Sequence, residues 1–320
     1  MRAVTYDRYG PPSVLRHEHM PVPEPKSEQV LVEVKATSVN LSDWETLTGR
    51  PVYARIGGLR KPANPILGSD IAGVVASVGL GVTEFRPGDE VYGDNLSLKG
   101  GFAEFAVVPT KSLAAKPGEL SFAEASVIPQ TGAIAHQGTI GFEAGQRVLI
   151  NGGGGGSGSF AIPLAKRAGT HVTAVDNAGK LDFMRQLGAD EVFDYRQVDF
   201  TSTGERYDRI LDLVAYRPVR AYLRALAPGG VYQCVGGSVP TLLRVLTAGT
   251  VLGRLSGRRI GILGVHPGPK HFAPITDMCV NGELKVYVDQ ILGLGSVPDA
   301  LQMVGEGRPL GKLVVEVGRT

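Results

Sequence analysis

A run of five consecutive glycines, residues 152–156, stands in the stretch LINGGGGGSGSF between two apolar segments. Glycine loses more conformational freedom on folding than any other residue, so such a run needs a physical reason. Backbone N–H groups at the start of a helix can bind a pyrophosphate, and a Cβ atom would obstruct that approach. We therefore predict a dinucleotide-phosphate loop formed by Gly153, Gly154, Gly155, Gly156, Ser157 and Gly158.

The context of this loop supports the prediction more than its Gly-x-Gly-x-x-Gly spacing, which a glycine run satisfies almost automatically. A strand-like apolar segment precedes the loop, a helix-like segment follows it, and a second strand-like segment comes next. The alternative is a flexible linker. A linker does not account for the regular alternation of strand and helix patterns that starts at once, so we favour the phosphate loop.

The residues expected at the adenosine end of a cofactor give conflicting signals. The second predicted strand ends at Asp176, where a carboxylate usually holds the ribose 2′-hydroxyl of NAD. Lys180 follows four residues later, well placed for the 2′-phosphate of NADP, and Tyr195-Arg196 ends the next strand within reach of the adenosine. A lysine about 4 Å from a phosphate gains about 4 kcal/mol at an effective dielectric constant of about 20, and Asp176 would oppose it by a comparable amount. These residues leave NAD versus NADP open.

The pattern of predicted elements changes along the chain. Before about residue 108, alternating and β-branched segments (29–39, 71–79 and 100–108) are separated by Pro-rich and Gly-rich turns, which predicts a compact β barrel. After about residue 119, strands and helical segments alternate, which predicts a parallel sheet with helices on both faces. The fold class is therefore α/β, and the terminal strand GKLVVEV is expected to return to the first domain.

Composition excludes several classes of partner and setting. The formal net charge of +2 provides no concentrated basic surface for nucleic acid or an anionic membrane. No apolar run of roughly 18 residues is present, so no membrane span is expected. The two cysteines, Cys234 and Cys279, make neither a disulfide framework nor a four-ligand zinc site. The N-terminal segment lacks the apolar core of a signal peptide, and a reducing, cytoplasmic setting is expected.

Three segments carry a family resemblance: ATSVNLSDWETLTG, LGSDIAGVVASVGLGVTEFRPGDEVYG, and the region from VLINGGGGGSGSF to EVFDY. They resemble the zinc-independent quinone-oxidoreductase-like branch of the medium-chain dehydrogenase/reductase superfamily. The resemblance implies a GroES-like catalytic domain from residues 1–120 and 267–320, and a Rossmann dinucleotide-binding domain from residues 121–266. It also implies a homodimer through the edge of the Rossmann sheet, with the segment RRIGILGV as the edge strand.

The resemblance also bears on the cofactor. The family generally prefers NADPH, and Lys180 and Tyr195 match its phosphate- and ribose-contacting positions. Asp176 departs from the small residue common there, so NADH stays possible.

Zinc is not expected. The zinc members of the superfamily carry a cysteine and a Gly-His-Glu motif as metal ligands, and Asn40 and Ser69-Asp70 stand at the matching positions here. Loss of the metal removes the Lewis acid that stabilises a developing alkoxide, which disfavours simple alcohol oxidation. A quinone, or a carbonyl conjugated to C=C, spreads the incoming negative charge and needs less help.

Several residues follow as candidates for the site, each with a plainer alternative. Asn40 is expected near the nicotinamide ribose and the substrate by resemblance, and its alternative is a loop-capping role. Tyr53 is a candidate proton donor or a cleft-wall aromatic. Asp43 is a catalytic candidate that is expected to orient the loop or to pair with a nearby base, and a purely structural role is favoured over catalysis. The remaining candidates are the pocket residues Trp44, Asp70 and Thr131, and the cofactor contacts Gly236, Gly237 and Leu263.

The function predicted from these residues is reduction of a quinone or an α,β-unsaturated carbonyl by NAD(P)H. A second hypothesis is a dedicated tailoring or cyclising reductase of a biosynthetic pathway. A third is a non-catalytic NADPH-binding redox sensor. The segment between Trp44 and Lys61 is expected to determine which size of substrate the pocket accepts, but its sequence does not identify the substrate.

Overall fold

The chain divides into two compact units in the computed structural model, which describes residues 1–56 and 58–319. Unit 1 comprises Met1–Gly132 and Pro267–Thr320, and unit 2 comprises Ala133–His266. The division falls within helix α2 (Phe122–Thr139). The predicted assignment of residues 121–132 to the dinucleotide-binding domain stays a prediction. In the described part of the chain, no helix combines the length and apolar composition needed to cross a bilayer.

Unit 1 is built on a seven-stranded sheet, with strand order β14-β15-β3-β4-β5-β7 and β6 paired with β3. A separate antiparallel pair joins β1 to β2. The C-terminal β15 runs antiparallel to β3, with Val314 opposite Ser38, so the predicted return of the last strand to the first domain is confirmed. The strands of unit 1 are β1 (Arg2–Thr5), β2 (Arg16–His19), β3 (Gln29–Ser38), β4 (Asp70–Val78), β5 (Glu90–Asp94), β6 (Phe105–Pro109), β7 (Leu113–Ala115), β14 (Val288–Gly293) and β15 (Lys312–Glu316).

Helices α1 (Leu41–Thr48), α8 (Pro269–Val280) and α9 (Val297–Gly305) complete unit 1. Helix α1 starts directly after β3, with Asn40 as its N-cap residue, and ends at Gly49, which adopts the left-handed conformation with φ of 63°. It packs closely against α9, because a Cβ atom on Gly305 would lie 2.4 Å from Cε2 of Trp44. The local sequence therefore fixes both ends of the helix that presents Asn40 and Asp43.

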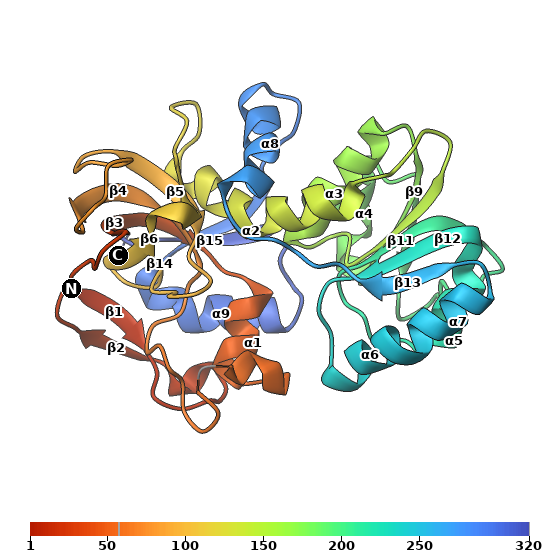
Figure 1. Ribbon diagram of the computed structural model, residues 1–320, viewed down its shortest axis with the longest axis horizontal. Coiled ribbons are helices and arrows are strands. Elements are labelled where there is room, and N and C mark those ends of the chain that lie inside the picture. Colours follow the sequence, from red (N-terminus) through yellow and green to blue (C-terminus); the bar gives the residue numbers. More distant parts are fainter. Residues whose placement is uncertain (57, 320) are drawn as a thin grey trace. The chain divides into compact units, whose positions relative to one another are not determined.

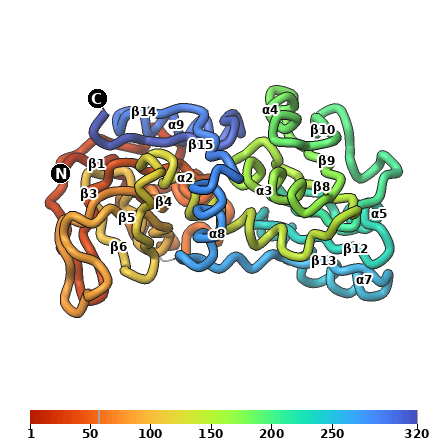
Figure 2. Tube along the Cα trace, turned by 90° about the horizontal axis from the view of Figure 1, so that it is seen from above, coloured from red at the N-terminus to blue at the C-terminus, as the bar shows by residue number. Residues whose placement is uncertain are grey.

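Unit 2 is a six-stranded parallel sheet with strand order β10-β9-β8-β11-β12-β13. Its strands are β8 (Arg147–Asn151), β9 (His171–Asp176), β10 (Glu191–Asp194), β11 (Tyr207–Asp212), β12 (Leu226–Cys234) and β13 (Arg259–Ile262). Figures 1 and 2 show α3 (Gly156–Arg167) and α4 (Leu181–Gln186) on one side of this sheet. The other side carries α5 (Val219–Ala225), α6 (Val239–Arg244) and α7 (Thr250–Leu255). The predicted α/β class is confirmed.

The order of the strands determines where unit 2 can hold a ligand. From β8 the chain proceeds outward through β9 and β10 on one side, and then returns to build β11, β12 and β13 on the other. The reversal creates a topological switch point at the carboxyl end of β8, where open parallel sheets bind their ligands. Val148, Leu149 and Ile150 of β8 are fully buried because helices cover both faces of the strand. The glycine run begins where this strand ends.

Candidate functional site

The glycine loop connects β8 to α3 and excludes side chains by close packing. Gly152 has φ of 86°, a conformation that favours glycine. A Cβ atom on Gly158 would lie 2.3 Å from the carbonyl oxygen of Gly153, and one on Gly154 would lie 2.6 Å from Cδ of Lys180. Three glycines, Gly152, Gly154 and Gly158, are therefore favoured by the backbone conformation and packing of the protein itself, apart from any ligand.

The first turn of α3 provides the anion-binding capacity of this loop. Gly155 is the N-cap residue, and no side chain caps the helix. The N–H groups at the start of an α-helix have no acceptor within the helix, and the helix dipole makes this end positive. Gly156, Ser157 and Gly158 occupy these positions. Such N–H groups are suited to a pyrophosphate, and binding of a cofactor by this loop stays a prediction.

Asp176 and Lys180 lie beside the loop and are paired with each other. Oδ2 of Asp176 accepts a hydrogen bond from the N–H of Gly154 at 3.0 Å and lies 3.7 Å from Nζ of Lys180. Oδ1 accepts from the backbone N–H and the side-chain Nδ2 of Asn177, at 2.8 and 3.2 Å. The two residues that gave opposite cofactor signals thus form a partly buried ion pair.

The other predicted cofactor contacts lie at the same edge of the sheet, because all its strands are parallel. Tyr195 follows β10, is 39% exposed, and donates its backbone N–H to the carbonyl of Asp176 at 3.0 Å. Gly236 and Gly237 follow β12, with φ of 74° and 134°. Leu263 follows β13 and donates its backbone N–H to the carbonyl of Cys234 at 2.9 Å. The structure therefore gathers these residues near the carboxyl ends of the strands, and their contact with a cofactor stays a prediction.

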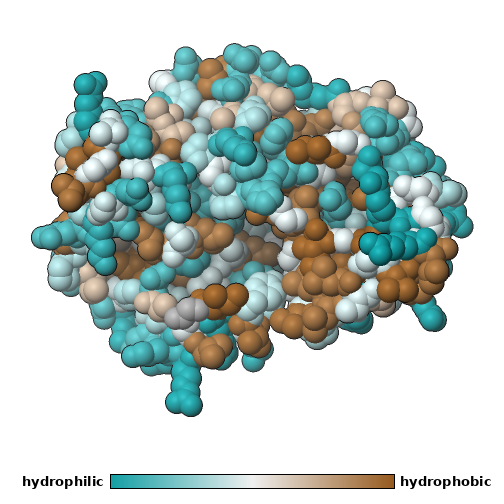
Figure 3. Space-filling model, in the orientation of Figure 1, coloured by the Kyte–Doolittle hydropathy of each residue, from teal (hydrophilic) through white to brown (hydrophobic). Residues whose placement is uncertain are grey.

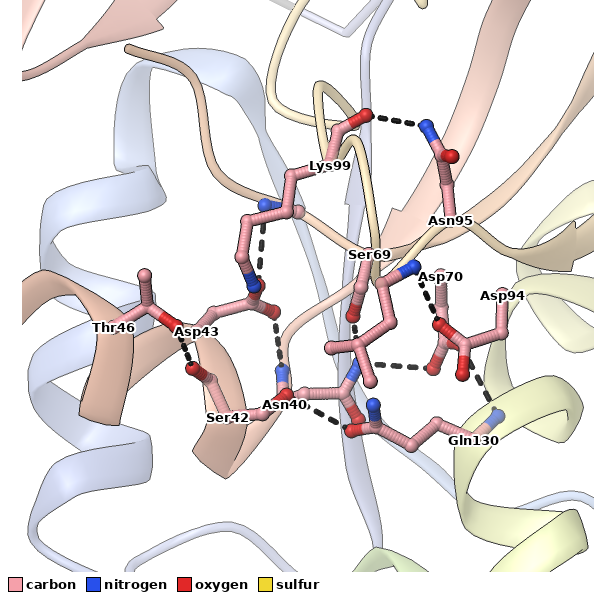
Figure 4. A network of polar contacts seen from close by, with 12 residues as sticks. Asn40, Ser42, Asp43, Thr46, Ser69, Asp70, Asp94, Asn95, Lys99 and Gln130 are labelled. Carbon is pink, nitrogen blue, oxygen red and sulfur yellow. Dashed lines mark hydrogen bonds and ion pairs between the residues drawn. The ribbon is translucent and has the colours of Figure 1, made fainter. Parts of the chain in front are cut away.

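Unit 1 contains a buried polar cluster, which we define as Asn40, Asp43, Ser69, Asp70, Asp94, Lys99 and Lys312. None of its members is more than 8% exposed. Figure 4 labels all of these residues except Lys312. Three carboxyl groups and two lysines are rarely buried together, and such groups need partners to be tolerated. The polar groups of the cluster therefore need hydrogen-bond and ion-pair partners from within the protein.

Asn40 lies at the centre of the cluster, and its side-chain amide is fully engaged. Nδ2 donates to Oδ2 of Asp70 at 2.9 Å and to Oγ of Ser69 at 3.3 Å. Oδ1 accepts from Nζ of Lys312. Both N–H donors are therefore used inside unit 1, which fixes the orientation of the amide. The predicted contact of Asn40 with cofactor and substrate stays a prediction. The structure shows that Ser69, Asp70 and Lys312 hold the Asn40 side chain in place.

Within the cluster, Asp70 is the carboxyl group whose pKa is raised most, to about 8. Burial raises its pKa, the nearby Asp94 raises it further, and the ammonium of Lys312 lowers it only in part. Burial also raises the pKa of Asp94 and lowers that of Lys312. Oδ2 of Asp70 additionally accepts from Ser38 Oγ at 3.0 Å, and Oδ1 accepts from the N–H of Gln130 at 3.1 Å. The cluster thus reduces its charge repulsion by favouring a protonated carboxyl group.

Asp43 joins two segments of unit 1 through backbone contacts. Its Oδ2 accepts from the N–H of Asn40 at 3.0 Å, and its Oδ1 accepts from the N–H of Gly68 at 3.2 Å. Nζ of Lys99 lies 3.9 Å from Oδ1 and has no hydrogen-bond partner in the described residues. Both carboxylate oxygens are thus used in contacts within unit 1, and the role of Asp43 in the site stays a prediction.

The other pocket candidates have local roles as well. Trp44 packs against Gly305, as described above. Thr131 is buried on α2, and its hydroxyl donates to the carbonyl of Val127 in the same helix. Tyr53 is partly exposed in a short 3₁₀ helix, Val52–Arg55. A pocket made by these residues stays a prediction.

Sequence reasoning missed several members of the site. No sequence motif pointed to Lys99, Lys312 or Asp94. The same holds for Gln130, whose Oε1 accepts a hydrogen bond from Ser42 Oγ at 3.0 Å. Glu45 was also missed, although it stands in the same α1 segment as Asn40 and Asp43. Among residues 1–56 and 58–319, no three His, Cys, Asp or Glu side chains are grouped to hold a metal ion.

Two family models match the chain. The alcohol dehydrogenase GroES-like domain matches residues 26–118, and the zinc-binding dehydrogenase model matches residues 187–315.

Individual proteins match over nearly the whole length. A chloroplastic quinone oxidoreductase of Triphysaria versicolor is 32% identical and covers 99% of this chain and 98% of its own. An NADPH-dependent alkenal/one oxidoreductase from chloroplasts of Arabidopsis thaliana is 34% identical and covers 80% of this chain and 68% of its own. The structure of the quinone oxidoreductase from Coxiella burnetii superposes with a TM-score of 0.89 at 28% identity, covering 99% of each chain.

A GroES-like domain combined with a Rossmann sheet defines the class of the medium-chain dehydrogenases/reductases. Within that superfamily, the chain belongs to the quinone-oxidoreductase-like branch. The family and the fold predicted from the sequence are confirmed.

Proposed function

We propose that this chain is a zinc-independent, NADPH-dependent reductase of quinones or α,β-unsaturated carbonyl compounds. The observation that carries the proposal is the glycine loop at the switch point of unit 2, where the uncapped first turn of α3 offers N–H groups to a pyrophosphate. Relatives named as a quinone oxidoreductase and as an NADPH-dependent alkenal/one oxidoreductase support this reaction class.

The residues of unit 2 fit a nicotinamide dinucleotide. Gly153, Gly154, Gly155, Gly156, Ser157 and Gly158 would hold the pyrophosphate, with Tyr195 near the adenosine ribose and Gly236, Gly237 and Leu263 toward the nicotinamide. When bound, the reduced cofactor supplies a hydride. The protein's own residues would bind and orient it.

The donor set of unit 1 supports chemistry without zinc. Zinc sites in proteins use thiolate, imidazole and carboxylate ligands. Asn40 and Ser69 are poor zinc ligands, and the Asn40 amide is held by hydrogen bonds to Ser69, Asp70 and Lys312. A substrate that delocalises negative charge needs less electrophilic help than a simple ketone, so a conjugated acceptor fits this site best.

The edge of unit 2 supports a homodimer as part of the proposal. Strand β13 is an edge strand that pairs with β12 alone among the described residues. Large apolar side chains of the adjoining helices are more than half exposed, and Figure 3 shows apolar surface in this region: Leu243, Leu246, Val251 and Leu255. A mass of about twice the 33.8 kDa chain in light scattering would support the dimer, and a monomer at micromolar concentration would oppose it.

The function is tested by following oxidation of NADPH and NADH with a benzoquinone, a naphthoquinone, an acyclic enone and a simple ketone. We expect turnover of the conjugated acceptors and little or none of the ketone. Turnover of the ketone alone would contradict the proposal. Binding of NADPH without turnover of any acceptor would favour a dedicated biosynthetic reductase or a redox sensor instead.

A further inference from the structure

The carboxylate of Asp176 has its acceptor positions used inside unit 2. A carboxylate offers about four lone-pair positions. In Asp176 these face the Gly154 N–H, the Lys180 ammonium, and the two nitrogen donors of Asn177. The side chain is 13% exposed. A ribose 2′-hydroxyl could bind Asp176 only by displacing one of these donors, so the residue does not act as a selector for NADH.

Lys180 is committed to the same pair. Its side chain is 5% exposed, and its Cδ and Cβ atoms would lie 2.6 and 2.7 Å from a Cβ atom on Gly154. The lysine therefore packs against the glycine loop, and its positive charge is offset by Asp176. A paired and buried ammonium adds little net attraction for a phosphate outside the pair.

Arg196 is a further cation near this edge, two residues after the end of β10. It is exposed and forms no ion pair in the described part of the chain. Its guanidinium lies 5.4 Å from the centre of the Tyr195 ring, and its Nε donates to Tyr195 Oη at 3.3 Å. The nearest anion by sequence, Asp194, is buried, and its Oδ1 accepts from the backbone N–H of Arg196 at 3.1 Å.

The position of Arg196 is fixed relative to Asp176 by the sheet. Asp194 pairs with Asp176 in the parallel register of β10 and β9, and the Tyr195 N–H donates to the Asp176 carbonyl. An arginine can bind phosphate oxygens through two parallel N–H groups, which an ammonium cannot do. The turn after β10 thus presents a phosphate-binding group beside the end of β9.

We propose that Arg196 selects the 2′-phosphate of NADPH, while the Asp176–Lys180 pair stays closed and supports the glycine loop. This inference rests on the proposed function, since it assumes that unit 2 binds a nicotinamide dinucleotide. It assigns the cofactor preference to Arg196 instead of to Asp176 or Lys180, the two residues at the positions that usually determine this preference.

The test measures binding of 2′,5′-ADP and 5′-AMP by titration calorimetry, which isolates the adenosine end from catalysis. We expect the wild-type protein to prefer 2′,5′-ADP, and Arg196→Ala to lower that preference by about tenfold, or about 1.4 kcal/mol. Lys180→Met should weaken both nucleotides to a similar extent, because it leaves Asp176 uncompensated beside the loop. The matched control is Arg220→Ala, an exposed arginine on α5, which should keep the preference.

Three results would overturn the inference. Arg196→Ala with an unchanged preference would remove Arg196 from the phosphate site. Loss of the preference in Lys180→Met alone would return that role to Lys180. Failure of the wild-type protein to bind either nucleotide, or NADPH itself, would overturn both this inference and the proposed function.

Discussion

The carboxyl group of Glu45 lies partly buried on α1 and has no hydrogen bond or ion pair among the residues that the structure describes. Burial raises its pKa from 4.5 to about 7. The elements packed against α1 bring few charges: Asp299 on α9, and Arg55, whose Nε donates to the Gly49 carbonyl at 2.9 Å and whose guanidinium stacks on Tyr9. The shift therefore reflects loss of hydration rather than a charged neighbour.

This shift predicts a defined pH dependence of stability. The folded protein holds the Glu45 proton more tightly than the unfolded chain, so the free energy of unfolding falls as pH rises from about 4.5 to about 7. Glu45→Gln removes this loss, and its stability relative to the wild type should rise across that range and then level off. Urea unfolding at pH 5 and pH 8 measures the difference. An equal difference at both values would contradict the assignment.

At the scale of elements, the contact between α1 and α9 positions the polar cluster. Gly305→Ala places a Cβ atom 2.4 Å from Trp44 and should destabilise the protein by about 1–3 kcal/mol, because the helices must separate. Trp44 is the only tryptophan in the chain, so its fluorescence reports the change directly. Gly295→Ala is the control, since a Cβ atom there meets nothing within 4 Å. An unchanged emission spectrum and stability in Gly305→Ala would contradict this packing.

Some of these elements could be predicted from the sequence, and others could not. The position of the glycine loop between a strand and a helix and the parallel sheet were predictable, because they depend on patterns of residues close together in the chain. The polar cluster was not. Its members come from the N-cap and first turn of α1, the start of β4, the end of β5 and the loop after it, and the start of β15. The register of β3 with β4 and β15, and of β4 with β5, brings these distant segments together.

The pairing of Asp176 with Lys180 could not be predicted from spacing either. They are four positions apart in the sequence, and the 3₁₀ turn Ala178–Lys180 brings the lysine side chain against Gly154. Taken alone, Asp176 would indicate NAD and Lys180 would indicate NADP. Their mutual neutralisation appears only when the side chains are placed.

At the scale of the whole molecule, cofactor binding should stabilise the fold by mass action. NADPH at 100 times its dissociation constant should add about 2.7 kcal/mol to the free energy of unfolding and raise the melting temperature. Gly155→Ala should keep nearly the stability of the ligand-free protein, because its Cβ atom would meet only the Gly152 carbonyl at 3.6 Å. It should lose most of the NADPH effect, since a side chain at the N-cap of α3 is expected to obstruct the close approach of a pyrophosphate to the loop.

Scanning calorimetry with and without NADPH makes this comparison. Gly118→Ala in unit 1 provides the control, because its Cβ atom meets no other atom within 4 Å. An equal rise in melting temperature for Gly155→Ala and Gly118→Ala would remove the loop from the binding site.

The most direct test of the central claim is the fate of deuterium from NADPH labelled at C4 of the nicotinamide, with an acyclic enone as acceptor. The account predicts a saturated ketone that carries the label at its β-carbon, detected by NMR of the product. An allylic alcohol with the label on its carbinol carbon would contradict the account, because it would mean direct reduction of the carbonyl rather than of the conjugated double bond.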